Sequence, residues 1–365
     1  MQNYNKKFLE KLTIVLPSFE RQDFLIRFIN YWSNKLVKVI IMDGSKKSLD
    51  QKIIENLEKN IKYYHLPKSF YERMYKATVL VNTEFVIQAC DDEFYIPSAL
   101  NSSIIKLIDN PDLVTCGGYC MGFGYENRSV IGFKRYEMLE NLKLLNSNPS
   151  ERINKHFSNY VPAHLYSVSR TKIWRIASKT VYSKEYSFFG ALELQLEFLL
   201  LFAGKTIILP ELMWLRSNEN EPIHDGTPSF APKNTFKDWW VNKRFSSEKR
   251  DFILRMELAC KEIDDINNSS NKPNIKKGFK NLVYFHKHGT IGLLWVFLDP
   301  LIKLFPSFKN GIRTLYNFIY YKKPIKNDLM IMANKYFENQ TKVNFNELII
   351  IKDAINDFHK KKQLN

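Results

Sequence analysis

Short apolar runs alternate with helical patterns over the first 115 residues of the chain. Four runs of five or six residues have the length and apolar content of buried strands, and apolar residues recur at helical spacing between them. The predicted strands cover residues 12–16, 37–42, 61–65 and 84–89, and the predicted helices cover residues 23–35, 48–60 and 71–81. This alternation predicts an α/β fold, with a mostly parallel sheet and helices on both of its faces.

The pattern becomes irregular between residues 115 and 232, where Tyr, Phe and Asn are frequent. One helix is predicted in this region, over residues 189–203 with Gly204 at its end. A short strand is predicted to follow over residues 206–209. The rest of the region carries no clear periodic signal, so its secondary structure is left open.

Strand signals nearly vanish in the last third of the chain. Residues 233–266 and the tail 325–365 have helical patterns, and a polar linker is predicted over residues 263–273. We therefore predict two domains. An α/β domain covers residues 1–232, and a mainly α-helical, basic and aromatic domain covers residues 233–365.

Composition excludes several classes of protein. Apolar residues make up 45% of the 365 residues and charged residues 25%, so the chain can build a core and is not a disordered polypeptide. No apolar run reaches the length of about 18 residues that a membrane span needs, and the start lacks the apolar segment of a signal peptide. We therefore expect a cytoplasmic protein. The four cysteines form no C-x-x-C pair, which argues against a disulfide framework and a structural zinc site.

Positive charge is concentrated in the C-terminal third. The net charge of the chain is +16, and residues 233–365, with 25 basic and 13 acidic residues, carry +12 of it. Residues 275–324 combine basic with aromatic side chains, which is typical of an interfacial helix on an anionic membrane but also fits a packed helical domain with a solvated basic face. Nucleic-acid binding is disfavoured, because the chain has no helix-turn-helix, zinc-finger or RNA-recognition signature.

Three consecutive carboxylates, Asp91, Asp92 and Glu93, follow the fourth predicted strand. The carboxyl ends of parallel strands share one edge of a sheet, so this cluster should lie beside Pro17–Arg21 and Asp43–Lys47. Adjacent like charges raise one another's pKa unless a cation neutralises them, and carboxylate oxygens suit Mg²⁺ and Mn²⁺. A solvated loop that places negative charge at a helix N-terminus would have the same sequence.

The order and spacing of these segments resemble the GT-A nucleotide-sugar glycosyltransferases, in the family 2-like group of bacterial surface-polysaccharide enzymes. The resemblance covers about residues 10–225 and rests on Leu12–Arg21, Val39–Ser45 and the acidic segment Gln88–Pro97. It implies a GT-A, Rossmann-like sheet, a UDP- or GDP-sugar donor, and a glycan or lipid-linked acceptor in capsule or lipooligosaccharide assembly. It also implies Mn²⁺ or Mg²⁺ as cofactor, and a location in the cytoplasm or peripherally on the inner membrane.

The resemblance assigns roles to individual residues. It implies that the metal ligands are Asp91, Asp92, Glu93 and His224. It implies that the residues that bind the nucleotide sugar are Pro17, Ser18, Phe19, Glu20, Arg21, Asp43, Arg73, Asp91 and Arg216. Two positions depart from the family pattern: Met42 precedes Asp43 where a second Asp is usual, and Cys90 stands where the metal motif often begins.

An inverting transferase also needs a base that deprotonates the acceptor hydroxyl. The family usually carries it at the start of a helix that ends in Gly, and the segment Phe188–Gly204 looks similar. Glu193 is the first choice for this base and Glu197 the second, because both lie on one helical face in an apolar setting that raises a carboxyl pKa. The alternative is an amphipathic helix whose glutamates face solvent.

The resemblance therefore implies a metal-assisted glycosyltransferase. A sugar-phosphate nucleotidyltransferase is disfavoured, because no Gly-rich loop follows the first strand. A non-catalytic nucleotide-sugar-binding or scaffold module of a polysaccharide assembly complex is the second interpretation. Cys90 and the single Asp43 are the features that favour it.

Overall fold

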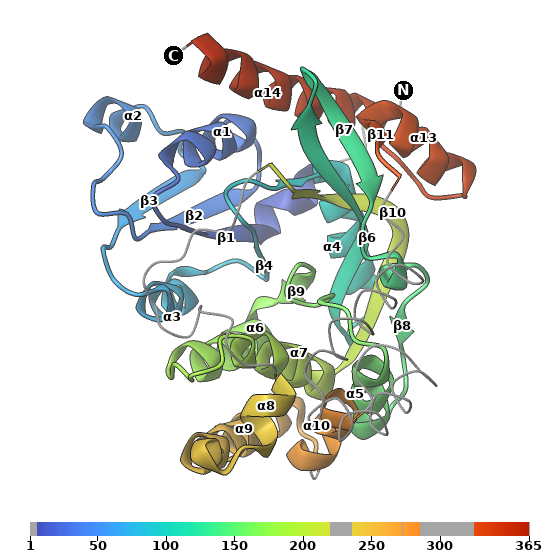
Figure 1. Cartoon of the computed structure of the whole chain (residues 1–365). Helices are drawn as coiled ribbons and strands as arrows, with labels where there is room; N and C mark the ends of the chain where they lie inside the picture. Colours follow the sequence, from blue (N-terminus) through green and yellow to red (C-terminus); the bar gives the residue numbers. More distant parts are fainter. Residues whose placement is uncertain (1–5, 220–235, 272, 285–324, 365) are drawn as a thin grey trace, which may run out of the picture.

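The computed structural model of the chain describes residues 6–219, 236–271, 273–284 and 325–364 (Figure 1). The centre of this described part is one sheet of 11 strands with helices around it. In chain order the strands are β1 (Leu12–Ser18), β2 (Lys38–Asp43), β3 (Ile61–His65), β4 (Phe85–Gln88), β5 (Phe94–Tyr95), β6 (Leu113–Glu126), β7 (Ser129–Lys134), β8 (Lys143–Leu144), β9 (Val168–Arg170), β10 (Lys205–Ser217) and β11 (Asn327–Asp328).

The strands lie in the order β11-β7-β6-β9-β4-β1-β2-β3, and β10 pairs with β5, β6 and β8 beside this path. The half formed by β4, β1, β2 and β3 is parallel throughout, with Val15 aligned to Ile40 on one side and Gln88 on the other. In the other half, β10 runs parallel to β6, while β7, β9 and β11 are antiparallel to their neighbours. The predicted fold class is confirmed.

Alternation along the strands builds two apolar cores, one on each face of the sheet. On β1, Ile14 and Leu16 belong to the first core and Val15 to the second; on β2, Ile41 and Met42 divide in the same way. Successive side chains of a strand point to opposite faces. A strand that is buried on both faces therefore needs the continuous apolar run that the sequence shows.

Helices close each core. The first core includes residues of α1 (Gln22–Trp32), α4 (Pro97–Asp109), α13 (Leu329–Glu338) and α14 (Phe345–Leu364). The second includes residues of α3 (Phe70–Leu80), α5 (Pro149–Ser158), α6 (Thr171–Tyr182), α7 (Ala191–Ala203), α8 (Phe236–Val241), α9 (Ser246–Asn267) and α10 (Ile275–Tyr284). The remaining short helices are η1 (Lys6–Lys11), α2 (Gln51–Glu55), η2 (Glu137–Leu139) and η4 (Lys243–Phe245). Among the helices of the described residues, none is long and apolar enough to cross a bilayer.

The helix α7 lies inside the protein, packed on α5, α6 and α9. Its residues are buried nearly all round, from Leu192 to Phe202, as expected of a helix with no polar face. Gly204 ends it, as predicted. A Cβ atom at Gly204 would lie 2.5 Å from Val114 Cγ2, so the turn into β10 can approach β6 this closely only without a side chain.

The sequence reading missed the longest strand, β6, together with β7 and most of β10. All but the last two residues of β6 are buried, so it lacks the alternation of apolar and polar positions that marks a half-exposed strand. It also contains four glycines, which weaken strand propensity. A Cβ atom at Gly118 would lie 2.5 Å from the carbonyl oxygen of Glu211 on β10, so contact between these two strands explains one of the four.

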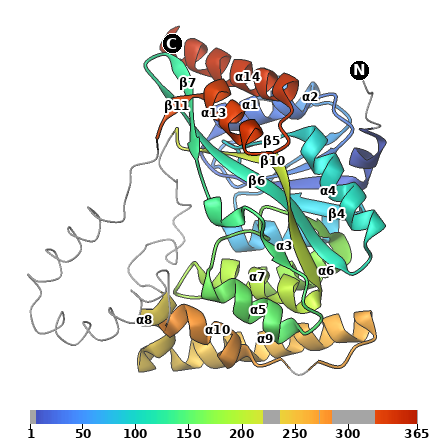
Figure 2. The ribbon, with the colours of Figure 1, turned by 90° about the vertical axis from the view of Figure 1, so that its right-hand side faces the viewer.

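The C-terminal helices pack at two different places (Figure 2). The helices α8, α9 and α10 lie at one end of the molecule beside α5 and α7, whereas α13 and α14 lie at the opposite end against β7. The predicted polar linker over residues 263–273 begins too early, because α9 continues to Asn267. The predicted domain boundary between residues 232 and 233 falls outside the described residues and stays a prediction. The helical character predicted for residues 325–365 is confirmed for α13 and α14.

A buried carboxylate ties α14 to the sheet. The Glu219 carboxylate, just beyond β10, accepts hydrogen bonds from Arg27 Nη1 and Nη2 on α1, at 2.9 and 2.7 Å. On its other side it lies 2.6 Å from His359 Nε2 on α14, and the His359 ring stacks on Tyr125 at a centroid distance of 4.0 Å. Burial by itself would raise the pKa of Glu219, but the bonds from His359 and Arg27 outweigh it and hold the pKa below its ordinary value.

This ion pair predicts an acid-sensitive contribution to stability. A carboxylate with a lowered pKa stabilises the fold above its unfolded pKa of about 4.3, and the contribution is lost as the pH falls through the lower folded pKa. We expect Glu219→Gln to reduce the free energy of unfolding at pH 7 by about 3 kcal/mol, because it leaves Arg27 buried without its partner. The difference from wild type should shrink below about pH 4 in urea unfolding experiments, because protonated Glu resembles Gln.

The matched control is Glu137→Gln, at a glutamate that is 63% exposed and forms a 3.6 Å ion pair with Lys134. Exposed pairs of this kind contribute little, so the control should lie within about 0.5 kcal/mol of wild type at every pH. A Glu219→Gln effect that does not change with pH would contradict the assigned ion pair.

Candidate functional site

The loops that follow β1, β2 and β4 meet at one edge of the sheet, as predicted from the parallel order. Ser18, at the end of β1, donates a 2.7 Å hydrogen bond to Asp91 beyond β4. The backbone N–H of Glu20 donates to Ser45 Oγ at 2.8 Å, and the Glu20 carboxylate accepts from the N–H of Lys46 at 2.7 Å. Segments separated by 25 to 73 residues in sequence are thus joined directly.

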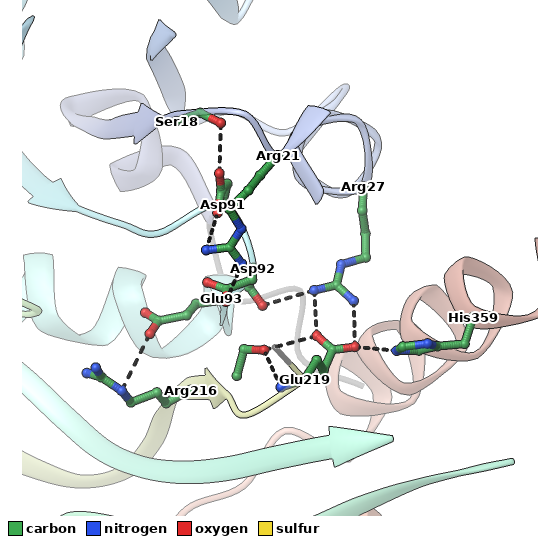
Figure 3. A network of polar contacts seen from close by, with 10 residues as sticks. Ser18, Arg21, Arg27, Asp91, Asp92, Glu93, Arg216, Glu219 and His359 are labelled. Atoms are coloured by element: carbon green, nitrogen blue, oxygen red, sulfur yellow. Dashed lines mark hydrogen bonds and ion pairs between the residues drawn. The ribbon is translucent and has the colours of Figure 1, made fainter. Parts of the chain in front are cut away.

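Asp91 and Asp92 share one arginine (Figure 3). Arg21 Nη1 lies 3.3 Å from Asp91 Oδ1, and Arg21 Nη2 lies 2.6 Å from Asp92 Oδ2. Asp91 is buried, and burial raises its pKa to about 7, because the charge of Arg21 and the hydrogen bond from Ser18 offset only part of the desolvation. Proximity to Asp92 raises it further. The pair of acids therefore needs a cation, and in this structure Arg21 supplies it.

Glu93 belongs to a separate pair (Figure 3). Its Oε2 atom accepts a 2.8 Å hydrogen bond from Trp214 Nε1, and its Oε1 atom lies 3.8 Å from Arg216 Nε. Burial is the main cause that raises the pKa of Glu93, and the charge of Arg216 opposes it. The Glu93 carboxylate is thus paired with two residues of β10, and the predicted metal set of Asp91, Asp92 and Glu93 stays a prediction.

The carboxylates of Asp91 and Asp92 form a donor set that fits a hard cation in its chemistry. Asp91 and Asp92 offer carboxylate oxygens, which are the ligands that Mg²⁺ and Mn²⁺ prefer. The Asp92 side chain is 14% exposed, so it reaches the surface of the site while Asp91 lies behind it. A metal ion at these oxygens would take over the place of the Arg21 guanidinium. His224, the remaining predicted ligand, lies outside the described residues.

Two predicted nucleotide contacts are buried in this structure. Asp43 accepts from the N–H and hydroxyl of Ser45 at 2.9 and 2.6 Å, and from the hydroxyl of Tyr63 at 2.7 Å. Arg73 donates to the carbonyl oxygens of Ser18 and Met42 at 2.7 and 2.8 Å. Both side chains therefore shape the loops after β1 and β2 from inside. Their direct contact with a nucleotide stays a prediction.

The other predicted contacts in the first loop lie at its surface. Pro17 and Phe19 are half-buried and Glu20 is exposed. Glu20 has a positive φ of 52°, which marks a tight turn directly before Arg21. This turn and the Glu20 contacts with the next loop give Arg21 its position beside Asp91 and Asp92.

The Arg216 guanidinium lies close to three aromatic rings. Its guanidinium carbon is 5.4 Å from the ring centres of Tyr136 and Tyr166 and 5.5 Å from that of Trp214, distances at which cation–π attraction acts. The side chain is 28% exposed, so the guanidinium is held in place and still reaches solvent. An arginine fixed in this way, close to the acidic cluster, can bind an anionic oxygen such as that of a diphosphate.

Glu193 stands at the start of α7 and accepts a very short hydrogen bond from the hydroxyl of Tyr160. The side chain is half-buried, and burial raises its pKa above the ordinary carboxylate value, while the bond from Tyr160 lowers it in part. Arg216 is near enough for its charge to oppose the rise as well. Glu193 therefore lies near Arg216 and has a pKa above the ordinary carboxylate value, which favours a carboxyl group that exchanges protons.

Glu197, one turn further along α7, is fully buried. Its Oε1 atom accepts from the N–H groups of His164 and Leu165 at 2.8 and 2.9 Å. Burial acts to raise its pKa, but the imidazoles of His164 and His156 and the N–H bonds outweigh burial and lower the pKa. A carboxylate enclosed in this way does not reach an acceptor hydroxyl. Of the two predicted bases, only Glu193 is open to solvent.

Sequence reasoning missed several residues around the site. Arg27 donates a 3.0 Å hydrogen bond to the carbonyl oxygen of Asp92, so the ion pair with Glu219 and His359 reaches the acidic segment (Figure 3). Tyr160, the partner of Glu193, lay in the region without periodic signal. One sequence signal could have identified Arg27: it is a charged residue on the apolar face of the helix α1.

Neither a protein-family model nor a curated protein sequence matches the chain. Among solved structures, the chain is similar to S. aureus TarS 1-349 in complex with UDP-GlcNAc, with 16% identity over 75% of this chain and 71% of that chain and a TM-score of 0.44. It is also similar to a second structure of S. aureus TarS 1-349, with 13% identity over 70% of this chain and 82% of that chain and a TM-score of 0.40.

Proposed function

We propose that the chain is a glycosyltransferase that moves a sugar from a nucleotide-diphosphate donor to a hydroxyl group. The observation that supports this proposal most strongly is the placement of an acid pair beside an arginine, together with a separate glutamate whose pKa is raised. Asp91 and Asp92, paired with Arg21, stand at the carboxyl end of parallel strands, which is where ligands bind in such sheets. Glu193 stands apart from them with a raised pKa and an open side chain.

In this proposal the donor lies across the ends of β1, β2 and β4. Arg21 and Arg216 bind the diphosphate oxygens, and their charges stabilise the diphosphate as it leaves. Asp91 and Asp92 would hold Mn²⁺ or Mg²⁺, which supplies further positive charge to the leaving group when it is bound. The enclosed position of Arg216 among aromatic rings keeps its guanidinium fixed, so little reorganisation is needed.

Glu193 acts as the base in the same proposal. It takes the proton of the acceptor hydroxyl, which then attacks the sugar carbon from the face opposite to the diphosphate and inverts its configuration. The Tyr160 hydroxyl holds the carboxylate in position through its hydrogen bond. The acceptor is a glycan or lipid-linked glycan of a surface-polysaccharide pathway, and the basic C-terminal third would meet the anionic inner membrane that carries it.

A second candidate is a nucleotide-sugar-binding module without catalytic activity. The specific observation that favours it is that Arg21 already neutralises Asp91 and Asp92. Titration calorimetry with UDP-GlcNAc, followed by measurement of released UDP, separates the two candidates. Binding without turnover over several acceptors and metals would favour the module.

The acid pair gives the first test of the transferase. Release of UDP from UDP-GlcNAc, with Mn²⁺ and a panel of sugar acceptors, should fall by about 10²-fold in Asp92→Asn, because Asp92 would hold the cation whose positive charge stabilises the leaving diphosphate. The matched control is Asp112→Asn, at an exposed acid before β6 that pairs with Lys205 at 2.9 Å, and it should keep wild-type turnover. Equal turnover in Asp92→Asn and wild type would reject the mechanism.

The role of Arg21 gives a second test. If Arg21 occupies the place of a metal ion, Arg21→Met should bind Mn²⁺ more tightly than wild type, because the competing cation is gone. Thermal unfolding should show a larger rise of Tm with Mn²⁺ in this variant. Arg250→Met, at an exposed position on α9, is the control and should match wild type. An equal rise of Tm in all three proteins would show that Arg21 does not compete with Mn²⁺, and no rise in Arg21→Met would show that the acid pair holds no metal.

The base gives the third test. A base acts in its deprotonated form, so kcat/KM should rise with pH through the pKa of Glu193, above the ordinary carboxylate range. Glu193→Gln should lower kcat by about 10²- to 10⁴-fold and remove this acid limb. Tyr160→Phe removes the hydrogen bond that lowers the pKa, so the limb should move to higher pH. A limb that stays in place in both variants would exclude Glu193 as the base.

A further inference from the structure

Three metal-ligating side chains meet inside the protein, away from the acidic cluster. His156 comes from α5, His164 from the loop before β9, and Glu197 from α7, and all three are buried. His156 Nε2 lies 2.9 Å from Glu197 Oε2, and His164 Nε2 lies 3.6 Å from the same oxygen. One nitrogen or oxygen atom of each residue lies within 4.8 Å of the others.

The atoms that face one another in this cluster lack hydrogen-bond partners. Among the described residues, none forms a hydrogen bond of acceptable geometry with His156 Nε2, His164 Nε2 or Glu197 Oε2, and all three atoms are inaccessible to water. A buried polar atom without a partner costs about 1–3 kcal/mol, and folded proteins keep few of them. Three such atoms that converge on one point indicate a ligand between them.

The outward-facing atoms of Glu197 and His164 are held in place, whereas His156 Nδ1 has no hydrogen-bond partner among the described residues. Glu197 Oε1 accepts two backbone N–H bonds, and His164 Nδ1 lies 3.3 Å from the hydroxyl of Thr115. Partners of this kind orient metal ligands in proteins: the second ring nitrogen of a ligating His is bonded, and the first stays available. The Thr115 contact thus leaves His164 Nε2 as the nitrogen that faces the other two residues.

We propose that His156, His164 and Glu197 bind a transition-metal ion, with Zn²⁺ as the ion that fits best. Two imidazole nitrogens and a carboxylate oxygen are a ligand set that zinc takes, whereas Mg²⁺ and Ca²⁺ require oxygen ligands alone. Zinc–ligand bonds of about 2.0–2.2 Å in a tetrahedron place neighbouring ligand atoms about 3.3 Å apart. The distances of 2.9 and 3.6 Å from the two imidazoles to Glu197 lie on either side of this value.

The enclosed position assigns the ion a structural role. It joins α5 and the segment between α5 and β9 to α7, in addition to the hydrogen bonds that Arg152 on α5 donates to the carbonyl oxygens of Leu201 and Phe202 on α7. Tyr160 lies between the two histidines in sequence, and Glu193 precedes Glu197 by one helical turn. The ion therefore fixes both partners of the Tyr160–Glu193 hydrogen bond. The expectation from the cysteines, which argued against a structural zinc site, did not consider histidine and glutamate ligands from three separate segments.

Elemental analysis of the full chain tests this proposal. Protein expressed with zinc in the medium and then passed through a brief EDTA wash should retain about one equivalent of zinc, because buried structural zinc is bound tightly. His156→Gln and His164→Gln should each reduce the retained zinc by at least about tenfold. His65→Gln is the matched control, since His65 lies at the end of β3 beside Ser45, and Asp92→Asn separates the site from the acidic cluster. Both should retain zinc as wild type does.

Two further measurements remain informative if a histidine variant does not fold. An anomalous difference map of wild-type crystals, recorded above and below the zinc edge, should show a peak between the three side chains. Prolonged chelation of wild-type protein should lower its Tm, and added Zn²⁺ should restore it. Protein that retains no stoichiometric metal, shows no peak and has the same Tm with and without Zn²⁺ would overturn the proposal and leave a metal-free polar cluster.

Discussion

Burial of like charges at the end of β4 is the constraint on which the rest of the site depends. Asp91 and Glu93 are buried on either side of Asp92, and desolvation penalises each charge. Such a segment can stay folded only if cations approach it. Arg21 approaches Asp91 and Asp92 from the loop after β1, and Arg216 approaches Glu93 from β10. The two ends of the α/β region are thereby brought to one edge of the sheet.

Pairing of a buried carboxylate with a cation also links the C-terminal helix α14 to this edge of the sheet. Arg27 bonds both the carbonyl oxygen of Asp92 and the Glu219 carboxylate, which in turn meets His359 on α14. His359, which is 140 residues from Glu219 in sequence, thus supports the loop that carries the acids. The short β11 pairs with β7 and brings α13 and α14 back to the sheet. The position of α14 is therefore part of the architecture of the candidate site.

Two glutamates on one helix show how local environment decides the chemistry of a side chain. Glu193 and Glu197 lie one turn apart on α7, yet burial raises the pKa of the first, whereas the imidazoles and N–H groups around the second lower its pKa. Glu193 is half-buried at the start of the helix. Glu197 lies beneath the segment that carries His164. The proposed proton exchange therefore falls to Glu193, and the proposed structural ion to Glu197.

The amino-acid sequence by itself determined the parallel half of the sheet and the order of its loops, because apolar runs and helical spacing are local patterns. It also identified Asp91, Asp92 and Arg21, since parallel strands bring their carboxyl ends to one edge. It did not reveal β6, whose buried, glycine-containing sequence has no alternation, nor the clusters around Glu219 and Glu197. Those clusters join residues 33 to 192 positions apart. Only tertiary packing brings such residues together, because it sets which buried charge meets which partner.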